Sequence, residues 1–319
     1  MRNTILFILC IIVATSVWAN DVTADTFGSG ENQFNIDFVT IPGDNGDLGD
    51  WTCAYQSFSG VNHGNYRMGV YEITNSQWTK FKANIGMSVI GYPAHVYDED
   101  SYWTGEQIPA NNINWVEAAQ FVNWLNTSQG YHPAYNFTGT HGTADYTFVG
   151  QWDEAEAAEG TNRVRHKDAY YFLPSFDEWV KAAYWNGSSL QYYSTCGNIL
   201  PVPGVDSNYG QSWLNPSGPW DVGSGSMELN GTYDMTGNLW EYCDDLRFDG
   251  FDPDIYSSPQ VLYGTGADYC ENAGPACRSD WIFQYDDESF GFRVASVPEP
   301  CSVLLLGLGG LALRKRRKA

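Results

Sequence analysis

The residues best suited to chemistry lie in one dodecapeptide, Gly231-Thr-Tyr-Asp-Met-Thr-Gly-Asn-Leu-Trp-Glu-Tyr242. Asp234, Asn238 and Glu241 place three oxygen-bearing side chains around a turn at Gly237-Asn238, and both turn residues tolerate positive φ. Oxygen ligands crowded around a tight turn suit a hard cation such as Ca²⁺. The alternative is a turn whose polar groups cap their own backbone. The residue types alone leave both interpretations open.

Cysteines form the second group of candidates. The chain has seven, and Cys270 and Cys277 lie seven positions apart. Gly274-Pro275 between them predicts a rigid turn, and in an oxidising compartment the simplest interpretation is a disulfide joining the two. Five cysteines lie between the predicted sorting ends, so at most two disulfides can form within the mature domain and one thiol is left over.

Both ends of the chain have the pattern of sorting segments. Residues 1–19 combine a basic start at Arg2, an apolar core at 5–13 and small residues for cleavage, which predicts a secretory signal. A buried N-terminal helix is the alternative. At the other end, residues 297–319 join Pro298-Glu-Pro300, an apolar run at 303–313 and a basic cluster. This tail resembles the bacterial PEP-CTERM tail that an exosortase-type enzyme removes, so we expect transient membrane contact and an exported product at the cell envelope or surface.

The net charge of the chain limits the classes of partner that it can bind. The net charge is −22, and loss of residues 1–19 and of the tail beyond about Pro300 removes six positive charges, which would bring it to −28. Nothing in such a protein would neutralise phosphates, so nucleic acid is excluded as a partner.

Three helices are predicted to position the candidate residues. Each begins at a cap residue followed three positions later by Gln or Glu, the pattern of a capping box. The cap residues are Thr74, Asn114 and Ser175, with Gln77, Glu117 and Glu178 three positions on, and Gly86 ends the first helix. Trp78, Trp115 and Trp179 fall on the apolar faces of these helices, and we interpret them as core residues.

The remaining segments are predicted strands and loops. Residues 35–41 alternate as a first strand, after a polar, Gly-rich lead-in at 20–34 that we expect to be mobile. Residues 42–65 and 187–230 are expected to be loops. A further strand should precede the turn at Gly237.

The dodecapeptide resembles the G-x-Y-D-M-x-G-N-x-W-E-W signature of the formylglycine-generating enzyme family, also called the sulfatase-modifying-factor family. Four further segments resemble the family's motifs in the same order: residues 66–81, 112–125, 171–183 and the Gly-Phe-Arg-Val strand within 290–295. The resemblance implies one mixed α+β domain over about residues 35–296, in the family's variant of the C-type-lectin-like fold, with much irregular structure.

The resemblance also implies structural calcium. By this comparison Asp234 and Glu241 give side-chain oxygens to one Ca²⁺, and Gly237 and Leu239 give backbone carbonyls. Asn208 and Tyr209 would belong to a second site, because Asp206-Ser-Asn-Tyr209 resembles the family's A-N-Y element.

Catalysis in this family depends on two cysteines that bind Cu(I) and activate O₂, and the matching catalytic candidates are Cys270 and Cys277. Soft thiolates suit Cu(I). Relatives that make formylglycine space these cysteines five positions apart, whereas here they are seven apart and out of register with Arg278. The family's R-V-L-R-G-G-S-W element appears as residues 260–266, with Tyr263 in place of the second arginine.

Three functions follow from these observations. We expect a divergent or non-catalytic binding module, with a surface polysaccharide among its candidate ligands. The alternative is a copper-dependent oxidase that acts on a sulfatase cysteine, and whether the protein is an enzyme stays open. A structural matrix component shares all the evidence for the binding module. The iron-dependent branch of the superfamily is set aside, because the five histidines never take the H-x-x-x-H-x-E spacing.

Overall fold

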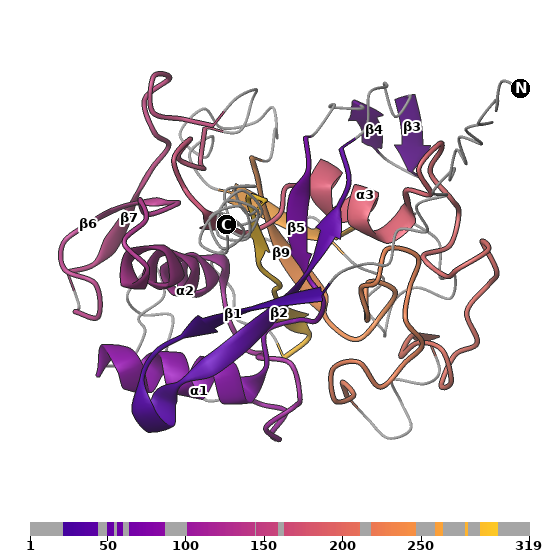
Figure 1. The fold of residues 1–319 in the computed structure, drawn as a ribbon, viewed down its shortest axis with the longest axis horizontal. Helices are drawn as coiled ribbons and strands as arrows, with labels where there is room; N and C mark the ends of the chain where they lie inside the picture. The colour runs from indigo at the N-terminus through magenta and orange to yellow at the C-terminus, as the bar shows by residue number, and fades with distance from the viewer. Residues whose placement is uncertain are drawn as a thin grey trace, which may run out of the picture.

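The structure is a computed structural model. It describes residues 22–43, 50–53, 56–59, 64–86, 101–143, 145–158, 163–210, 218–246, 259–263, 278–279 and 288–298, of which 50–53, 56–59, 245–246, 259–263 and 278–279 are described by their backbone alone. Cys270, Cys277 and both predicted sorting segments lie outside the described residues, apart from Val297 and Pro298. The mixed α+β class predicted from the sequence is confirmed (Figure 1).

The main sheet has five strands in the order β1-β2-β5-β13-β8, with every neighbouring pair antiparallel. Its strands are β1 Val22–Phe27, β2 Phe34–Ile41, β5 Tyr66–Gly69, β13 Ala295–Ser296 and β8 Tyr171–Phe172. The last strand of the chain, β13, therefore lies between two strands that come far earlier in the sequence.

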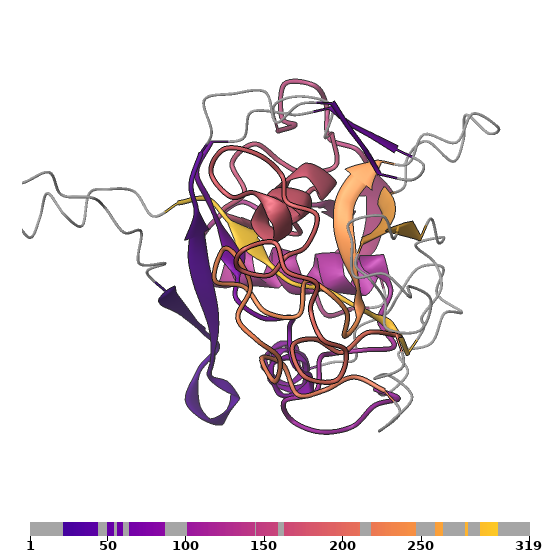
Figure 2. The same cartoon turned by 90° about the vertical axis from the view of Figure 1, so that its right-hand side faces the viewer.

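A second sheet has the order β11-β10-β9-β12. It consists of β11 Arg278–Ser279, β10 Pro259–Tyr263, β9 Trp240–Leu246 and β12 Phe290–Gly291. β12 runs parallel to β9, and Gly291 pairs with Glu241. Figure 2 shows the β1–β2 ribbon along one edge of the molecule and β9 toward the other. Two hairpins complete the strands: β3 Asp50–Cys53 with β4 Gln56–Ser59, and β6 Asn136–Thr138 with β7 Thr147–Gly150.

All three predicted helices are present, as α1 Asn75–Ile85, α2 Trp115–Ser128 and α3 Phe176–Tyr184. Each begins with the predicted capping box, in which the cap side chain accepts from the third backbone N–H and the Gln or Glu side chain accepts from the cap N–H. Gly86 ends α1 in the left-handed conformation, as expected.

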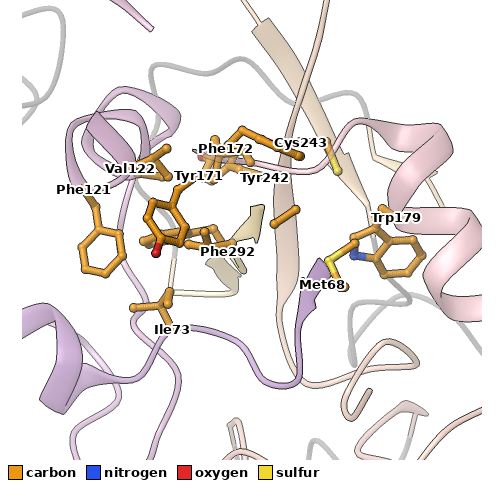
Figure 3. Close-up of a cluster of buried hydrophobic side chains, with 14 of the residues drawn as sticks. Met68, Ile73, Phe121, Val122, Tyr171, Phe172, Trp179, Tyr242, Cys243 and Phe292 are labelled. Atoms are coloured by element: carbon orange, nitrogen blue, oxygen red, sulfur yellow. The ribbon is translucent and has the colours of Figure 1, made fainter. Parts of the chain in front are cut away.

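Aromatic side chains fill the core between the helices and the sheets. Trp78, Trp115 and Trp179 are all buried, which confirms their interpretation as core residues. Phe121 of α2 contacts Phe292 edge to face, with ring centroids 5.4 Å apart. Figure 3 shows Phe121 and Phe292 with Ile73 on one side of this cluster, and Met68 with Trp179 on the other.

The structure corrects three expectations about the strands. Residues 22–27 of the supposed mobile lead-in form β1, which pairs with β2 along its whole length and buries Phe27 completely. Residues 50–59 of the supposed loop contain the β3–β4 hairpin. Residues 231–239 form turns rather than a strand, and β9 begins only at Trp240.

Within the described residues, no helix has the length and apolar content needed to cross a membrane.

Candidate functional site

The turn before β9 is held by left-handed backbone conformations. Asp234, Gly237 and Asn238 have φ of 63°, 102° and 65°. A Cβ atom at Gly237 would lie 2.3 Å from the carbonyl oxygen of Asn208, so only glycine fits there. The Asn238 N–H donates to the same Asn208 carbonyl over 2.9 Å. The predicted turn geometry at Gly237-Asn238 is thus confirmed, and it brings the Asn208 segment against the dodecapeptide.

Glu241, near the end of the dodecapeptide, forms a fully buried ion pair with Arg293. Nη2 of Arg293 lies 2.5 Å from Oε1 of Glu241, and Nε lies 2.6 Å from Oε2. The indole Nε1 of Trp179 also donates to Oε2 over 2.8 Å. The parallel pairing of β12 with β9 sets this contact, because Arg293 follows two residues after Gly291, the partner of Glu241.

Glu72, on the segment between β5 and α1, holds the other side of the turn. Its Oε2 accepts from Nδ2 of Asn238 over 2.7 Å, and its Oε1 accepts from the Leu239 N–H over 3.1 Å. Glu72 is 1% exposed. Burial first, and then the carboxyls of Asp234 and Glu241, raise the pKa of Glu72 well above its usual range.

Glu228 stabilises the loop that leads into the turn by accepting hydrogen bonds from it. It accepts from the backbone N–H groups of Met235 and Thr236, each over 3.0 Å, and from the hydroxyl of Ser194 over 2.8 Å. Burial raises the pKa of Glu228 to about 7. Asp234 accepts from the Gly223 N–H over 2.7 Å. Burial and the neighbouring Glu241 raise the pKa of Asp234 to about 6.

These contacts define an acid cluster of Glu72, Glu228, Asp234 and Glu241 around the guanidinium of Arg293. Burial alone would lower the pKa of Arg293, but the adjacent Glu241 raises it, so the cation is retained. Four carboxyls face one fixed positive charge, and all four are buried. The excess negative charge can be relieved by protonation, as the raised pKa values indicate, or by a bound cation.

The calcium ligands predicted at the turn are only partly placed for that role. Glu241 accepts three hydrogen bonds from Arg293 and Trp179, and the guanidinium opposes a second cation at the same oxygens. One carboxylate oxygen of Asp234 accepts a hydrogen bond from the Gly223 N–H. Within the described residues, the other oxygen of Asp234 accepts none. No three His, Cys, Asp or Glu side chains of the described chain converge as a metal site would require. Calcium here stays a prediction that depends on Asp234 and the carbonyls of Gly237 and Leu239.

Asn208 and Tyr209 are the residues predicted for the second calcium site. The Nδ2 group of Asn208 donates to the Gly218 carbonyl over 3.1 Å and to Oδ1 of Asn238 over 3.3 Å. The Tyr209 hydroxyl donates to the Pro201 carbonyl over 2.7 Å. Asn208 therefore lies beside the turn, whereas the Tyr209 side chain is directed to a neighbouring loop.

The predicted catalytic cysteines lie outside the described residues, whereas Tyr263 and Arg278 have a described backbone pairing. Tyr263 pairs with Glu241 on one side and with Arg278 on the other. Cys277 directly precedes Arg278 in the sequence. The position where tyrosine replaces the family arginine therefore lies in the sheet between Glu241 and Arg278.

Three residues at the acid cluster were not predicted from the sequence. Glu72 and Glu228 are single acids within short apolar runs, Tyr71-Glu-Ile73 and Met227-Glu-Leu229. An isolated acid in such a setting is the signal that could have marked them as buried and hydrogen-bonded. Arg293 lies in the terminal Gly-Phe-Arg-Val motif, which was expected to be one strand but is interrupted at residues 292–294, between β12 and β13. An arginine between buried Phe292 and Val294 carries the same signal.

Comparison with known proteins identifies the relatives of this architecture. Residues 24–297 match the sulfatase-modifying factor enzyme 1-like domain. The "Chaperone protein LppX" of Paenibacillus barcinonensis is 25% identical over 229 residues, which span 67% of this chain and 73% of that protein.

Solved structures show the same fold. The Treponema denticola variable protein 1 superposes with a TM-score of 0.60 at 22% identity, over 86% of this chain and 99% of that one. CarF superposes with a TM-score of 0.54 at 18% identity, over 83% and 99%. PvdO from Pseudomonas aeruginosa superposes with a TM-score of 0.54 at 15% identity, over 86% and 98%.

Proposed function

Because the chain belongs to the family of sulfatase-modifying factor enzyme 1-like domains, we propose that it is an exported, divergent member that acts as a binding module and does not form formylglycine. The observation that carries this proposal is the cysteine segment. Cys270 and Cys277 are seven positions apart, whereas formylglycine-forming members of the family space the two cysteines by five.

The chemistry of copper explains why this spacing matters. Cys270 and Cys277 would hold the metal, and copper would supply O₂ activation to an active enzyme. Both thiolates must reach one Cu(I), and Gly274-Pro275 restricts the segment that joins them. Tyr263 replaces an arginine of the active pattern and pairs directly with Arg278. Each change works against a copper centre of the family type.

The name of one relative supports a binding role. LppX is called a chaperone, and a chaperone acts by holding another molecule rather than by oxidising it. The ligands that we propose for the present chain are a surface polysaccharide or an exported polypeptide such as a sulfatase segment. A structural Ca²⁺ at Asp234 would stabilise the module.

Export is part of the proposal. Residues 1–19 would direct translocation, and the tail would contact the membrane until an exosortase-type enzyme removes the residues beyond about Pro300. The mature domain would carry a net charge of −28, which keeps copies of it apart in solution.

The rival function is the copper-dependent oxidase, favoured by two cysteines close to the family positions. The deciding experiment incubates the purified mature domain with Cu(I), O₂ and a sulfatase-derived Cys-x-Pro-x-Arg peptide, and measures the peptide mass. A formylglycine-forming relative serves as the positive control. We expect no mass change with this protein.

Two cysteine variants make the test specific. If the peptide is converted, and conversion is lost in Cys270→Ser and Cys277→Ser, the oxidase is correct and the binding-module proposal fails. Peptide mapping without reduction gives a second readout. A disulfide between Cys270 and Cys277 in the native protein would leave no thiolate for copper.

A further inference from the structure

Two cavities adjoin over the first turn of α1. This helix lies beside β2 (Figure 1). Their volumes are about 400 and 730 Å³, each within the roughly 300–1,000 Å³ range of small-molecule pockets. Ser76 and Lys80 line both cavities. We call the joined space the α1 trough. Because it consists of two cavities side by side, it suits several units of a linear polymer better than one compact ligand.

Polar side chains without partners face the smaller cavity. Asp37 on β2, Ser76 on α1 and Gln107 all line it. None of these three side chains makes a hydrogen bond within the described part of the chain, although each carries strong donors or acceptors. A carboxylate, an amide and a hydroxyl that line one cavity can together donate to and accept from the hydroxyl groups of a sugar ring.

Tyr71 supplies an aromatic wall in the same cavity. Its ring packs against Tyr233 with centroids 5.2 Å apart, and a Cβ atom at Gly223 would lie 2.6 Å from its Cε1. These two contacts hold the Tyr71 ring in one orientation. The C–H face of a pyranose ring can pack on such a surface, while its hydroxyls reach the polar groups around the rim.

The charges around the trough disfavour anionic polymers. Glu31, Asp37 and Glu106 line the two cavities, and the cations that line them are Lys80 and Lys82. The Lys80 ammonium already donates to the Gln33 carbonyl over 3.1 Å. With a net charge of −22 on the whole chain, uronate or sulfated polymers would be repelled.

The strand arrangement disfavours an extended peptide in the trough. Peptides commonly bind by adding a strand to a free sheet edge. β2, which supplies Asp37, is paired on both sides, by β1 and by β5. It therefore offers no backbone groups to a ligand strand.

We propose that the α1 trough binds an uncharged hexose polymer, with one sugar ring packed on Tyr71 and hydrogen-bonded by Asp37, Ser76 and Gln107. This inference rests on the proposed binding function and names its site and ligand class. No covalent step is involved.

Isothermal titration calorimetry tests the site with maltohexaose, cellohexaose, mannohexaose and chitohexaose as uncharged probes. Oligogalacturonate is the anionic probe, and the sulfatase-derived peptide is the polypeptide probe. We expect at least one uncharged hexaose to bind. Its affinity should fall at least tenfold in Asp37→Ala and in Gln107→Ala, because each variant removes hydrogen bonds to the sugar. Asp153→Ala, which removes a carboxylate from an exposed position outside the trough, should bind like the wild type.

The thermal midpoint of each variant is measured first, so that a folding defect is not mistaken for lost binding. Asp37 and Gln107 make no side-chain hydrogen bond within the described residues, so both variants should retain the wild-type midpoint. The proposal is overturned if no uncharged hexaose binds, if only oligogalacturonate or the peptide binds, or if Asp37→Ala and Gln107→Ala bind like the wild type. None of these results bears on formylglycine formation, which the copper assay decides separately.

Discussion

Arg293, two residues beyond the end of β12, forms a bidentate ion pair with Glu241 of the neighbouring strand β9, with both side chains at most 1% exposed. The guanidinium also donates to the Gly69 carbonyl over 3.1 Å and to the Tyr233 carbonyl over 3.0 Å. Arg293 thus joins β5 of the main sheet, the turn before β9, and β9 itself. It is the only cation whose attraction opposes the raised pKa of Glu72, Glu228 and Asp234 in the described structure.

Arg293→Met should destabilise the domain by about 3–5 kcal/mol, because it leaves Glu241 buried without its partner. Urea unfolding followed by tryptophan fluorescence measures this change. Arg163→Met removes the same side chain from an exposed position and should stay within about 0.5 kcal/mol of the wild type. Equal effects of the two substitutions would contradict a special role for Arg293.

The stability of the domain should fall as pH rises from 5 to 8 in the presence of EGTA. The pKa values of Asp234 and Glu228 are about 6 and about 7 in the folded protein and about 4 when unfolded. Between these values the folded state binds more protons than the unfolded state, so the free energy of unfolding decreases with pH. Thermal unfolding at a series of pH values tests this sign, and a midpoint that rises through the same window would refute it.

Asp234→Asn should reduce that pH dependence and stabilise the domain at pH 8 by roughly 1–3 kcal/mol in EGTA. The amide oxygen can still accept from the Gly223 N–H, and asparagine tolerates the φ of 63°. The substitution therefore removes one buried charge and little else. Asp153→Asn, at an exposed position, should leave the pH profile unchanged.

Added Ca²⁺ should raise the thermal midpoint at pH 8 relative to EGTA, since a ligand bound only by the folded state must stabilise it. At a free concentration one hundred times the Kd, the gain is about 2.7 kcal/mol. The shift should shrink at pH 5, where protonation of Asp234 competes with the metal, and in Asp234→Ala. An unchanged midpoint in the wild type at pH 8 would argue against structural calcium at this turn.

Gly237→Ala should cost at least about 3 kcal/mol, because the new Cβ would lie 2.3 Å from the Asn208 carbonyl in addition to the strain at φ of 102°. Gly187 is a matched control, with φ of 91° and no atom within 4 Å of the Cβ that alanine would add. Gly187→Ala should cost only about 1–2 kcal/mol, the strain alone. Urea unfolding of both variants separates the close approach from the backbone conformation.

Local signals in the sequence are sufficient for the helices. A capping box needs only residues three positions apart, so Thr74, Asn114 and Ser175 are all identified correctly. β1 gives no such signal, because half of its residues are polar and only Phe27 is buried. That strand exists because β2 pairs with it, and pairing of this kind leaves little trace in either segment alone.

The candidate site is predicted only in part for the same reason. The oxygen-rich turn is contiguous in the sequence, so Asp234, Asn238 and Glu241 are found together. Glu72 and Arg293 lie 166 and 52 residues from their respective partners Asn238 and Glu241. No spacing rule connects such distant residues, so the ion pair that occupies Glu241 becomes evident only in the folded chain.

The central place of β13 in the main sheet has a consequence for the order of folding. Met68 and Phe172 both pair with Ala295, so β5 and β8 cannot be joined into one sheet until the end of the domain is present. Arg293 arrives with the same segment. A polypeptide that is synthesised or threaded through a membrane from its N-terminus would therefore remain incomplete until nearly the whole domain had emerged, and its buried carboxyls would lack their counter-ion until then. The main sheet is complete only when this strand has paired, so the integrity of the whole domain depends on its C-terminal segment.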